Sequence, residues 1–390
     1  MGIDLDEVRA ETPGCQGGVA HFNNAGAALP PQAVIDAVEA QFRLESTIGG
    51  YEAAERSAEA IERFYDAIAG LIGARRDEIA YVENATRAWD MAFYAIPFRR
   101  GDRILTTTSE YASNAIAYFQ VAEARGVSVE VVPDDEHGTM SLEALEAELA
   151  KGGVRLVAIN HIPTHNGLIN PAAEVGRLAR AAGALYLLDA CQSVGQLPVD
   201  VTEIGCDLLS ATGRKFLRGP RGTGFLYVRQ EILPDLQPPF LDLLSAEWTA
   251  RESYELRDDA RRFETWERYI AGQIGLGVAA DYAAGLGIEA IQDRVSGLAA
   301  SLREGLAAKP GVTLLDRGEH KSGLVSFTLA GHDSGAVKLA LRERGINVST
   351  TDGAHQRFDD HAVPSAVRAS PHYYNTEEEV ERLLAALPSP

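Results

Sequence analysis

Cysteine is scarce in this sequence, and its three cysteines, Cys15, Cys191 and Cys206, are widely spaced. Thiols so few and so scattered exclude a disulfide framework and a zinc site built on cysteine pairs. The nine histidines show no spacing typical of metal ligands. We therefore predict no metal site.

Long hydrophobic runs and excess positive charge are also missing. No apolar run approaches the roughly 20 residues that a membrane-spanning helix needs. The first residues, Met1 to Glu7, are acidic and lack the apolar core of a signal peptide. The formal net charge is −20, which disfavours nucleic acid and anionic membranes as partners. We expect a cytoplasmic protein that binds neither.

Two common nucleotide-binding loops are absent as well. The glycine-rich stretch from Gly219 to Gly224 opens a strand rather than a helix, and no Gly-Lys-Ser/Thr ending occurs. Both facts argue against a P-loop NTPase. The first strand-to-helix turn carries no G-x-G-x-x-G, which argues against a Rossmann oxidoreductase.

The chain does contain a regular alternation of strand-like and helical segments from about residue 30 to 230. Strands are predicted at 79–82, 103–107, 127–132, 154–159, 184–188 and 207–211, and helices at 30–42, 53–72, 86 onward, 114–125, 142–149 and 172–182. Such alternation predicts an α/β fold with a mainly parallel sheet and helices on both faces. The strand 222–228 follows its predecessor too closely for a crossover helix, so we expect it to run antiparallel.

At 390 residues the chain is long enough for two domains. We predict an N-terminal segment at 1–20, a large domain at 21–264, a connecting helix at 265–285 and a smaller α+β domain at 286–390. In the last part, 323–329 and 366–370 are strand-like, whereas 335–344 and 377–387 are helical.

Two of these strands end next to chemically useful side chains. Asp189 closes the apolar run from Ala184 to Leu188, and Lys215 follows the neighbouring run in a short loop. Open α/β sheets bind ligands at the carboxyl ends of their strands. A lysine that forms a Schiff base, and a carboxylate that keeps a pyridine nitrogen protonated, are what pyridoxal phosphate (PLP) chemistry requires. Alone, Asp189 is equally consistent with a helix cap or a magnesium ligand, and most lysines are surface charges.

Other residues fit the same cofactor, each with an ordinary alternative. Backbone N–H groups of Ala85 and Thr86 at a helix start suit a phosphate, although this segment by itself favours a simple helix cap. Thr212 and Arg214, which flank Gly213, suit the same phosphate. Gln192 suits the phenolic oxygen. Tyr111 suits stacking on the pyridine ring, or plain packing.

Arg368 lies in an otherwise apolar strand near the C-terminus. A buried arginine is costly without an anionic partner. That partner is either the α-carboxylate of a substrate or a carboxylate of the protein itself.

Together these segments resemble the class V aminotransferase family, the fold-type I PLP-dependent enzymes that include cysteine desulfurases. The resemblance rests on Phe22 to Gly26, Asp189 to Gln192, Ser210 to Lys215 and Arg368 to Thr376. It implies that Lys215 is the Schiff-base lysine and that Asp189 pairs with the pyridine nitrogen. It also implies that Thr164 lies near the phenolic oxygen, and that Arg368 binds the substrate carboxylate.

The resemblance further implies a homodimer with shared active sites. Segments around Tyr51 and Trp266 would then contribute across the interface. The expected substrate-binding residues are Arg368, Tyr51, Asn24, His165 and Trp266. Tyr51, His165 and Trp266 are equally consistent with a structural role. Cys191, two residues after Asp189, is either near the cofactor or, as we favour, a small buried residue under the sheet.

One departure from the family governs the functional expectation. Desulfurases carry a nucleophilic cysteine in a loop before the carboxylate-binding arginine, and the matching stretch Ser349 to Arg357 has none. We therefore expect a β-eliminating carbon–sulfur lyase acting on a cysteine S-conjugate or its sulfoxide, resembling the hercynylcysteine sulfoxide lyase branch, rather than a persulfide-forming desulfurase. The alternatives are an aminotransferase or an epimerase resembling isopenicillin N epimerase, and a non-catalytic PLP-binding domain.

Overall fold

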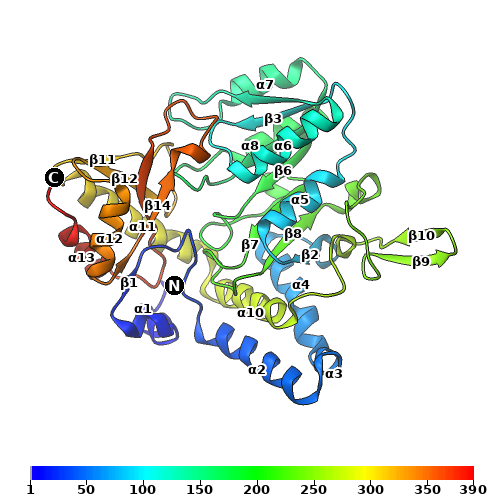
Figure 1. Cartoon of the computed structure of the whole chain (residues 1–390), viewed down its shortest axis with the longest axis horizontal. Helices are drawn as coiled ribbons and strands as arrows, with labels where there is room; N and C mark the ends of the chain where they lie inside the picture. The colour runs from blue at the N-terminus through cyan, green and yellow to red at the C-terminus, as the bar shows by residue number, and fades with distance from the viewer. Residues whose placement is uncertain (1) are drawn as a thin grey trace.

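The computed structural model describes residues 2–390, and its main element is a seven-stranded sheet in the order β2-β8-β7-β6-β5-β3-β4 (Figure 1). Its strands are β2 (Ile79–Val82), β3 (Arg103–Thr107), β4 (Ser128–Val132), β5 (Val154–Asn160), β6 (Leu185–Asp189), β7 (Leu208–Thr212) and β8 (Gly224–Val228). The pairs from β4 through β3, β5 and β6 to β7 are all parallel, whereas β8 runs antiparallel to both β7 and β2. The predicted mixed sheet, including its one reversed strand, is confirmed.

Helices cover both faces of this sheet, because the strand side chains alternate between two apolar cores. In β5, Val157 and Ile159 face one core, whereas Leu156 and Ala158 face the other. The first core is closed by α4 (Ala58–Ile72), α8 (Ala172–Ala181) and α10 (Ile270–Leu286), and the second by α5 (Ala85–Ala95) and α6 (Ala112–Arg125). The short helices α7 (Leu142–Ala150) and α9 (Val201–Ile204) complete the crossovers.

A second sheet of four strands, in the order β11-β12-β15-β14, forms the C-terminal part. Its elements are α11 (Ile288–Ala307), β11 (Val312–Leu314), β12 (Val325–Leu329), α12 (Ser334–Glu343), β14 (Ser349–Asp352), β15 (Ser365–Ala369) and α13 (Glu377–Ala386). Near the N-terminus, β1 (Ala20–His21) pairs with β13 (Ile346–Asn347), and Phe22 is part of the apolar core of this sheet. The chain therefore begins against the C-terminal part before it enters the large sheet.

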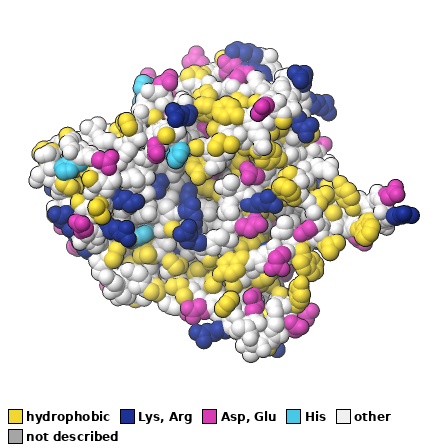
Figure 2. Space-filling model, viewed as in Figure 1, with side chains coloured by type: hydrophobic (Ala, Val, Ile, Leu, Met, Phe, Trp, Pro, Cys, Tyr) yellow, Lys and Arg dark blue, Asp and Glu magenta, His cyan; other side chains and the backbone are white. Residues whose placement is uncertain are grey.

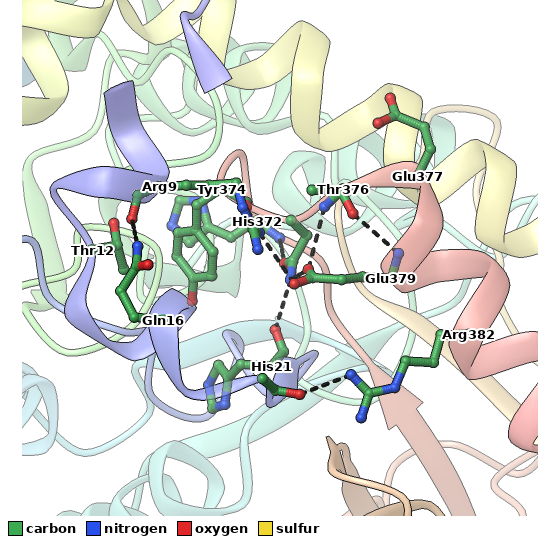
Figure 3. A network of polar contacts seen from close by, with 12 residues as sticks. Arg9, Thr12, Gln16, His21, His372, Tyr374, Thr376, Glu377, Glu379 and Arg382 are labelled. Atoms are coloured by element: carbon green, nitrogen blue, oxygen red, sulfur yellow. Dashed lines mark hydrogen bonds and ion pairs between the residues drawn. The ribbon is translucent and has the colours of Figure 1, made fainter. Parts of the chain in front are cut away.

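Polar contacts fix this junction of the two chain ends (Figure 3). Arg9 in α1 (Leu5–Ala10) donates to the carbonyl of Tyr374 at 2.7 Å and to the Glu379 carboxylate at 3.1 Å. From α13, Arg382 donates to the carbonyl of Gly18 at 2.8 Å. The N-terminal segment is thus held as a fixed part of the fold.

Two long helices differ from their predicted bounds. The helix predicted at 53–72 is divided into α3 (Gly50–Arg56) and α4 at Ser57, whose hydroxyl donates to Gln41 in α2 (Gln32–Ile48) at 2.6 Å. The connecting helix predicted from residue 265 begins only at Ile270. Its first residues instead form a loop in which Arg268 donates to Gln273 at 2.9 Å.

A hairpin of β9 (Ala246–Ala250) and β10 (Ser253–Leu256) projects from the body at the right of Figure 1. The sequence patterns did not predict it. Hydrophobic side chains lie along this projection in Figure 2, and Trp248 is 72% exposed. An exposed tryptophan on a projecting arm is typical of a surface that contacts another chain.

No single helix within residues 2–390 is long and apolar enough to cross a membrane. The pair α10 and α11 passes that test only when the two are taken together, on length and composition, and they are bent by 81°.

Candidate active site

The carboxyl ends of three neighbouring strands meet at one cavity of about 430 Å³. Parallel pairing sets Asn160 at the end of β5 beside Asp189 at the end of β6, and Asp189 beside Ser210 in β7. All nine residues predicted to hold the cofactor line this cavity: Ala85, Thr86, Tyr111, Thr164, Asp189, Gln192, Thr212, Arg214 and Lys215. The strand-end argument therefore located the cavity correctly.

Lys215 lies in the turn after β7, partly buried in this cavity. Burial lowers the pKa of its ammonium group, and the nearby charges of Arg214 and Arg368 lower it further, against the opposing effects of Cys191 and Asp189. A lysine with a lowered pKa is more often neutral, which is the form that attacks an aldehyde and accepts a proton. The environment thus prepares Lys215 for covalent bonding and proton transfer.

Asp189 is held by three N–H donors. Its Oδ1 accepts from the backbone N–H of Cys191 at 2.9 Å. Its Oδ2 accepts from the amides of Asn160 at 2.9 Å and Asn114 at 3.2 Å. Three donors fix the direction of the carboxylate. Asn114 and Asn160 were not predicted, although Asn160 follows a predicted strand and was open to the same strand-end argument.

The start of α5 offers free backbone N–H groups to the cavity. The Asn84 side chain caps Arg87 at 2.9 Å, so the N–H groups of Ala85 and Thr86 are left without a partner among the described residues. Gly224 in β8 passes close beneath, where a Cβ would lie 3.0 Å from the Asn84 carbonyl carbon. A helix start with free N–H groups beside Thr212 suits a phosphate.

Arg214 lines the cavity beside Lys215, and its guanidinium donates to the carbonyl of Gly26. The N-terminal segment is therefore anchored at the cavity. Lys and Arg side chains gather near the middle of the face shown in Figure 2, despite the negative net charge of the chain. A local positive field of this kind attracts anionic ligands.

Arg368 in β15 reaches the same region from the C-terminal part. Its guanidinium donates to the carbonyl and the hydroxyl of Thr164, at 2.8 and 2.7 Å, whereas its Nε is buried without a partner. Burial, with the charge of Arg214, lowers the pKa of Arg368 to about 10, so it remains cationic at neutral pH. No carboxylate of the described residues pairs with it, which favours an anion supplied by a substrate.

Two buried polar atoms that lack a hydrogen-bond partner in the protein test whether the cofactor and a substrate fit. The side chain of Gln192 donates to Thr164 and to the carbonyl of Ala25, both at 3.2 Å, and its buried Oε1 has no partner. The Nε of Arg368 is in the same state. Buried polar atoms without partners are rare unless a ligand completes them. With Lys215 and Asp189 in the same cavity, the residues fit PLP and an amino-acid carboxylate.

Four predicted substrate contacts lie elsewhere. Tyr51 and Trp266 line a separate cavity of about 830 Å³ and are 71% and 53% exposed. His165 lines a third cavity, and burial lowers the pKa of its imidazole to about 4. The amide of Asn24 is occupied by the carbonyls of His21 and Ser370, so it serves the fold. Within one chain, only Arg368 of the predicted substrate set reaches the cavity region.

Cys191 also differs from its interpretation. It is partly exposed and lines the cofactor cavity rather than lying under the sheet. Burial of its sulfur, together with the charge of Asp189, raises the pKa of its thiol well above the usual value. The thiol is therefore protonated at neutral pH and is a poor nucleophile.

Known proteins are similar to this chain over most of their length. A probable cysteine desulfurase from Methanothermobacter thermautotrophicus is 33% identical over 341 residues, which cover 86% of this chain and 84% of that protein. The apo structure of a cysteine desulfurase from Thermococcus onnurineus matches with a TM-score of 0.91 at 28% identity, covering 99% of this chain and 97% of that one. A variant of the protein C-DES, solved with glycine covalently linked to its PLP cofactor, gives a TM-score of 0.87 at 25% identity, covering 97% of this chain and 98% of that one.

Fold and cavity together define a PLP-dependent enzyme of fold type I. Within that class, the model of the class V aminotransferases matches residues 20–383. The chain belongs to the class V aminotransferase family, and its cofactor is PLP.

The expectation of a carbon–sulfur lyase that is not a desulfurase is wrong. Relatives of this chain at 30–33% identity, and solved structures of the same fold, are named cysteine desulfurases. The inference failed because a missing cysteine in residues 349–357 excludes only that loop as the acceptor of sulfur.

Proposed function

We propose that this protein is a cysteine desulfurase, which converts L-cysteine to L-alanine and passes the sulfur atom to a thiol. The observation that carries the proposal is that Lys215 and Asp189 line one cavity, while Arg368 is hydrogen-bonded to Thr164 on the wall of that cavity. The names of its relatives supply the substrate. When bound, PLP withdraws electrons from the amino acid and so labilises its bonds.

The chain's own residues would bind and orient cysteine around that cofactor. Arg368 receives the α-carboxylate, while Thr164 fixes the guanidinium by accepting its other N–H groups. Nζ of Lys215 takes the proton from Cα and later returns a proton to the product. Burial favours this transfer, because it keeps the amine of Lys215 neutral at a lower pH.

The overall reaction balances with one acceptor thiol. The Cβ–Sγ bond of cysteine breaks, an S–S bond forms on the acceptor, and the acceptor's proton is retained in the products. Cysteine and R–SH thus give alanine and R–S–SH. Because the Cys191 thiol is protonated and residues 349–357 contain no cysteine, an assay should supply the acceptor as a small dithiol.

The test is a product analysis of the PLP-loaded protein with L-cysteine and a dithiol. We expect alanine and sulfide in equal amounts, since the dithiol releases sulfide from the persulfide. Lys215→Ala should form neither product, and the matched surface variant Lys321→Ala should behave as the native protein. Pyruvate and ammonia in place of alanine would overturn the proposal.

We also propose that two copies form a homodimer with shared active sites. The support is the cavity of about 830 Å³ between α3 and the loop before α10, which is lined by Tyr51, Leu244, Trp266 and Tyr269. Exposed aromatic side chains around a large hollow are typical of protein interfaces. Light scattering should give a dimer that Trp266→Glu dissociates. Leu339→Glu, on the exposed face of α12, is the control and should leave it intact.

A further inference from the structure

A second carboxyl group, that of Glu110, is buried behind Asp189. Glu110 lies between β3 and α6 and is only 3% exposed. Its Oε2 accepts from the hydroxyls of Thr106 at 2.7 Å and Tyr118 at 2.8 Å. Its Oε1 accepts from the backbone N–H of Tyr111 at 2.6 Å. These three donors therefore hold the carboxyl group of Glu110 in place.

The amide of Asn114 joins this carboxyl to Asp189. Its Nδ2 donates to Oε1 of Glu110 at 3.0 Å and to Oδ2 of Asp189 at 3.2 Å. A primary amide nitrogen carries two hydrogens, which is one for each carboxyl group. The Asn114 amide cannot rotate without breaking both contacts. Glu110 therefore fixes the orientation of the N–H group that donates to Asp189.

The charges around Glu110 come from few groups. Thr106 of β3 and Asn114 and Tyr118 of α6 are neutral donors, and Asp189 of β6 is the facing carboxylate. His165, which contacts the Glu110 backbone, has a pKa lowered to about 4 and is neutral. Burial, with the charge of Asp189, raises the pKa of Glu110 to about 7, against its hydrogen bonds. The charge of Glu110 therefore changes near neutral pH. The charges of Asn114, Tyr118 and His165 do not change there.

We propose that Glu110 is a positioning residue which, through the Asn114 amide, directs the Asp189 carboxylate toward the pyridine nitrogen of bound PLP. Nothing else in the cavity fixes Asn114, whereas Asn160 and the Cys191 N–H hold Asp189 from other sides. The competing explanation is structural: Glu110 would only anchor the loop that carries Tyr111.

The experiment measures two properties of the purified protein: its affinity for PLP, and the pH midpoint of the visible absorption of the bound cofactor. Glu110→Gln keeps the shape of the side chain and removes its charge. We expect PLP affinity to fall about 3-fold to 10-fold, because the hydrogen bond from Asn114 weakens when its acceptor loses its charge. We expect the pH midpoint to move down by about half a unit or more, because a nearby negative charge no longer stabilises the protonated cofactor.

Two further comparisons separate positioning from structure. Tyr118→Phe removes a donor to the far oxygen of Glu110 and leaves the Asn114 link, so its PLP affinity should match that of the native protein. In the background of Asn114→Ser, the change from Glu110 to Gln should alter PLP affinity less than about 2-fold, because the link is already lost. Glu110→Asp keeps the charge, so its pH midpoint should lie between those of Glu110→Gln and the native protein. If Glu110→Gln does not fold, Glu110→Asp replaces it in the double-mutant cycle with Asn114→Ser.

Several results would overturn the proposal. One is a Glu110→Gln variant whose affinity and midpoint match the native protein, while Asp189→Asn changes both. Another is strict additivity of the Glu110 and Asn114 substitutions, which would show that the two residues act separately. A third is a loss of PLP affinity in Tyr118→Phe as large as that in Glu110→Gln, since this would assign Glu110 to the fold alone.

Discussion

Individual side chains at the cavity carry charge that the fold leaves unmatched. Arg368 is 6% exposed, and its neighbours supply only a carbonyl and a hydroxyl of Thr164. Burying a guanidinium without an anion costs several kcal/mol. A ligand that supplies the anion would offset this cost, and the proposed function assigns that role to the substrate carboxylate.

The first prediction concerns that pairing. Arg368→Gln should raise KM for L-cysteine by roughly 10-fold to 100-fold, the value of about 1.5–3 kcal/mol for a hydrogen bond to a charged group. The turnover number should change much less, because carboxylate binding is nearly equal in the ground and transition states. Steady-state kinetics provide the measurement, with Arg317→Gln as an arginine control in a neighbouring cavity. A fall in turnover at unchanged KM would contradict this assignment.

A second prediction concerns Glu264, which is buried away from the cofactor cavity. It accepts from the Tyr81 N–H at 2.8 Å and the Tyr65 hydroxyl at 2.9 Å, and burial raises the pKa of its carboxyl to about 7. In the unfolded chain this pKa is about 4.3. Between the two values the native state holds a proton that the unfolded state has released, so stability falls as pH rises toward 7 and then levels.

Glu264→Gln should remove this pH dependence, because its amide oxygen can accept both hydrogen bonds and does not titrate. Between about pH 5 and about pH 8, the native protein should lose about 2 kcal/mol more unfolding free energy than the variant. Urea unfolding at a series of pH values measures the difference, and the titration of Glu110 cancels because both proteins contain it. Parallel pH profiles for the two proteins would show that Glu264 ionises normally.

At the scale of whole elements, local patterns predicted the part of the site that local rules govern. Short apolar runs with polar ends identified β5, β6 and β7, and parallel pairing then brought Asp189, Thr212 and Lys215 together. The hairpin β9–β10 was missed because its strands are short and mostly exposed, so they form no buried apolar run. Tyr51 and Trp266 depend on a second copy, whose position no pattern within one chain records.

Helix packing also depends on spacing that a sequence alone does not reveal. Gly176 in α8 lies so close to α9 that a Cβ would be 1.9 Å from the carbonyl oxygen of Ile204. Gly70 in α4 is the matched case, because a Cβ there meets nothing within 4 Å. In the sequence, both residues are glycines that weaken a helix, and only the structure shows that one of them is needed for close packing.

The third prediction follows from this contrast. Gly176→Ala should destabilise the protein by about 2–4 kcal/mol, because α8 and α9 must move apart. Gly70→Ala should stabilise it by about 0.5–1 kcal/mol through better helix propensity. Urea midpoints of the two variants test both signs. Equal effects would mean that α9 moves aside at little cost.

For the molecule as a whole, Arg218 connects segments that are far apart in the chain. Its side chain is 1% exposed and donates to the carbonyl of Leu29 at 2.7 Å, to the hydroxyl of Tyr373 at 2.8 Å and to that of Thr12 at 2.6 Å. The guanidinium also lies over the ring of Tyr374, 4.7 Å from its centroid. The backbone N–H of Arg218 donates to the carbonyl of Lys215 at 2.9 Å. One residue thus joins both chain ends to the turn that carries Lys215.

The last prediction is that Arg218→Met lowers both stability and cofactor affinity. Three acceptors would lose their buried donor, and the expected cost is about 3–5 kcal/mol of unfolding free energy. Arg218→Lys keeps the charge but reaches fewer acceptors, so it should fall between Met and the native residue. Because the turn at Lys215 loses its support, PLP should also dissociate more readily from both variants.

Thermal unfolding and PLP titration give the two readouts. The control is Arg63→Met, at an exposed pair with Asp281, which should cost less than about 1 kcal/mol. A large loss of stability with unchanged PLP affinity would show that Arg218 fastens the chain ends without supporting Lys215.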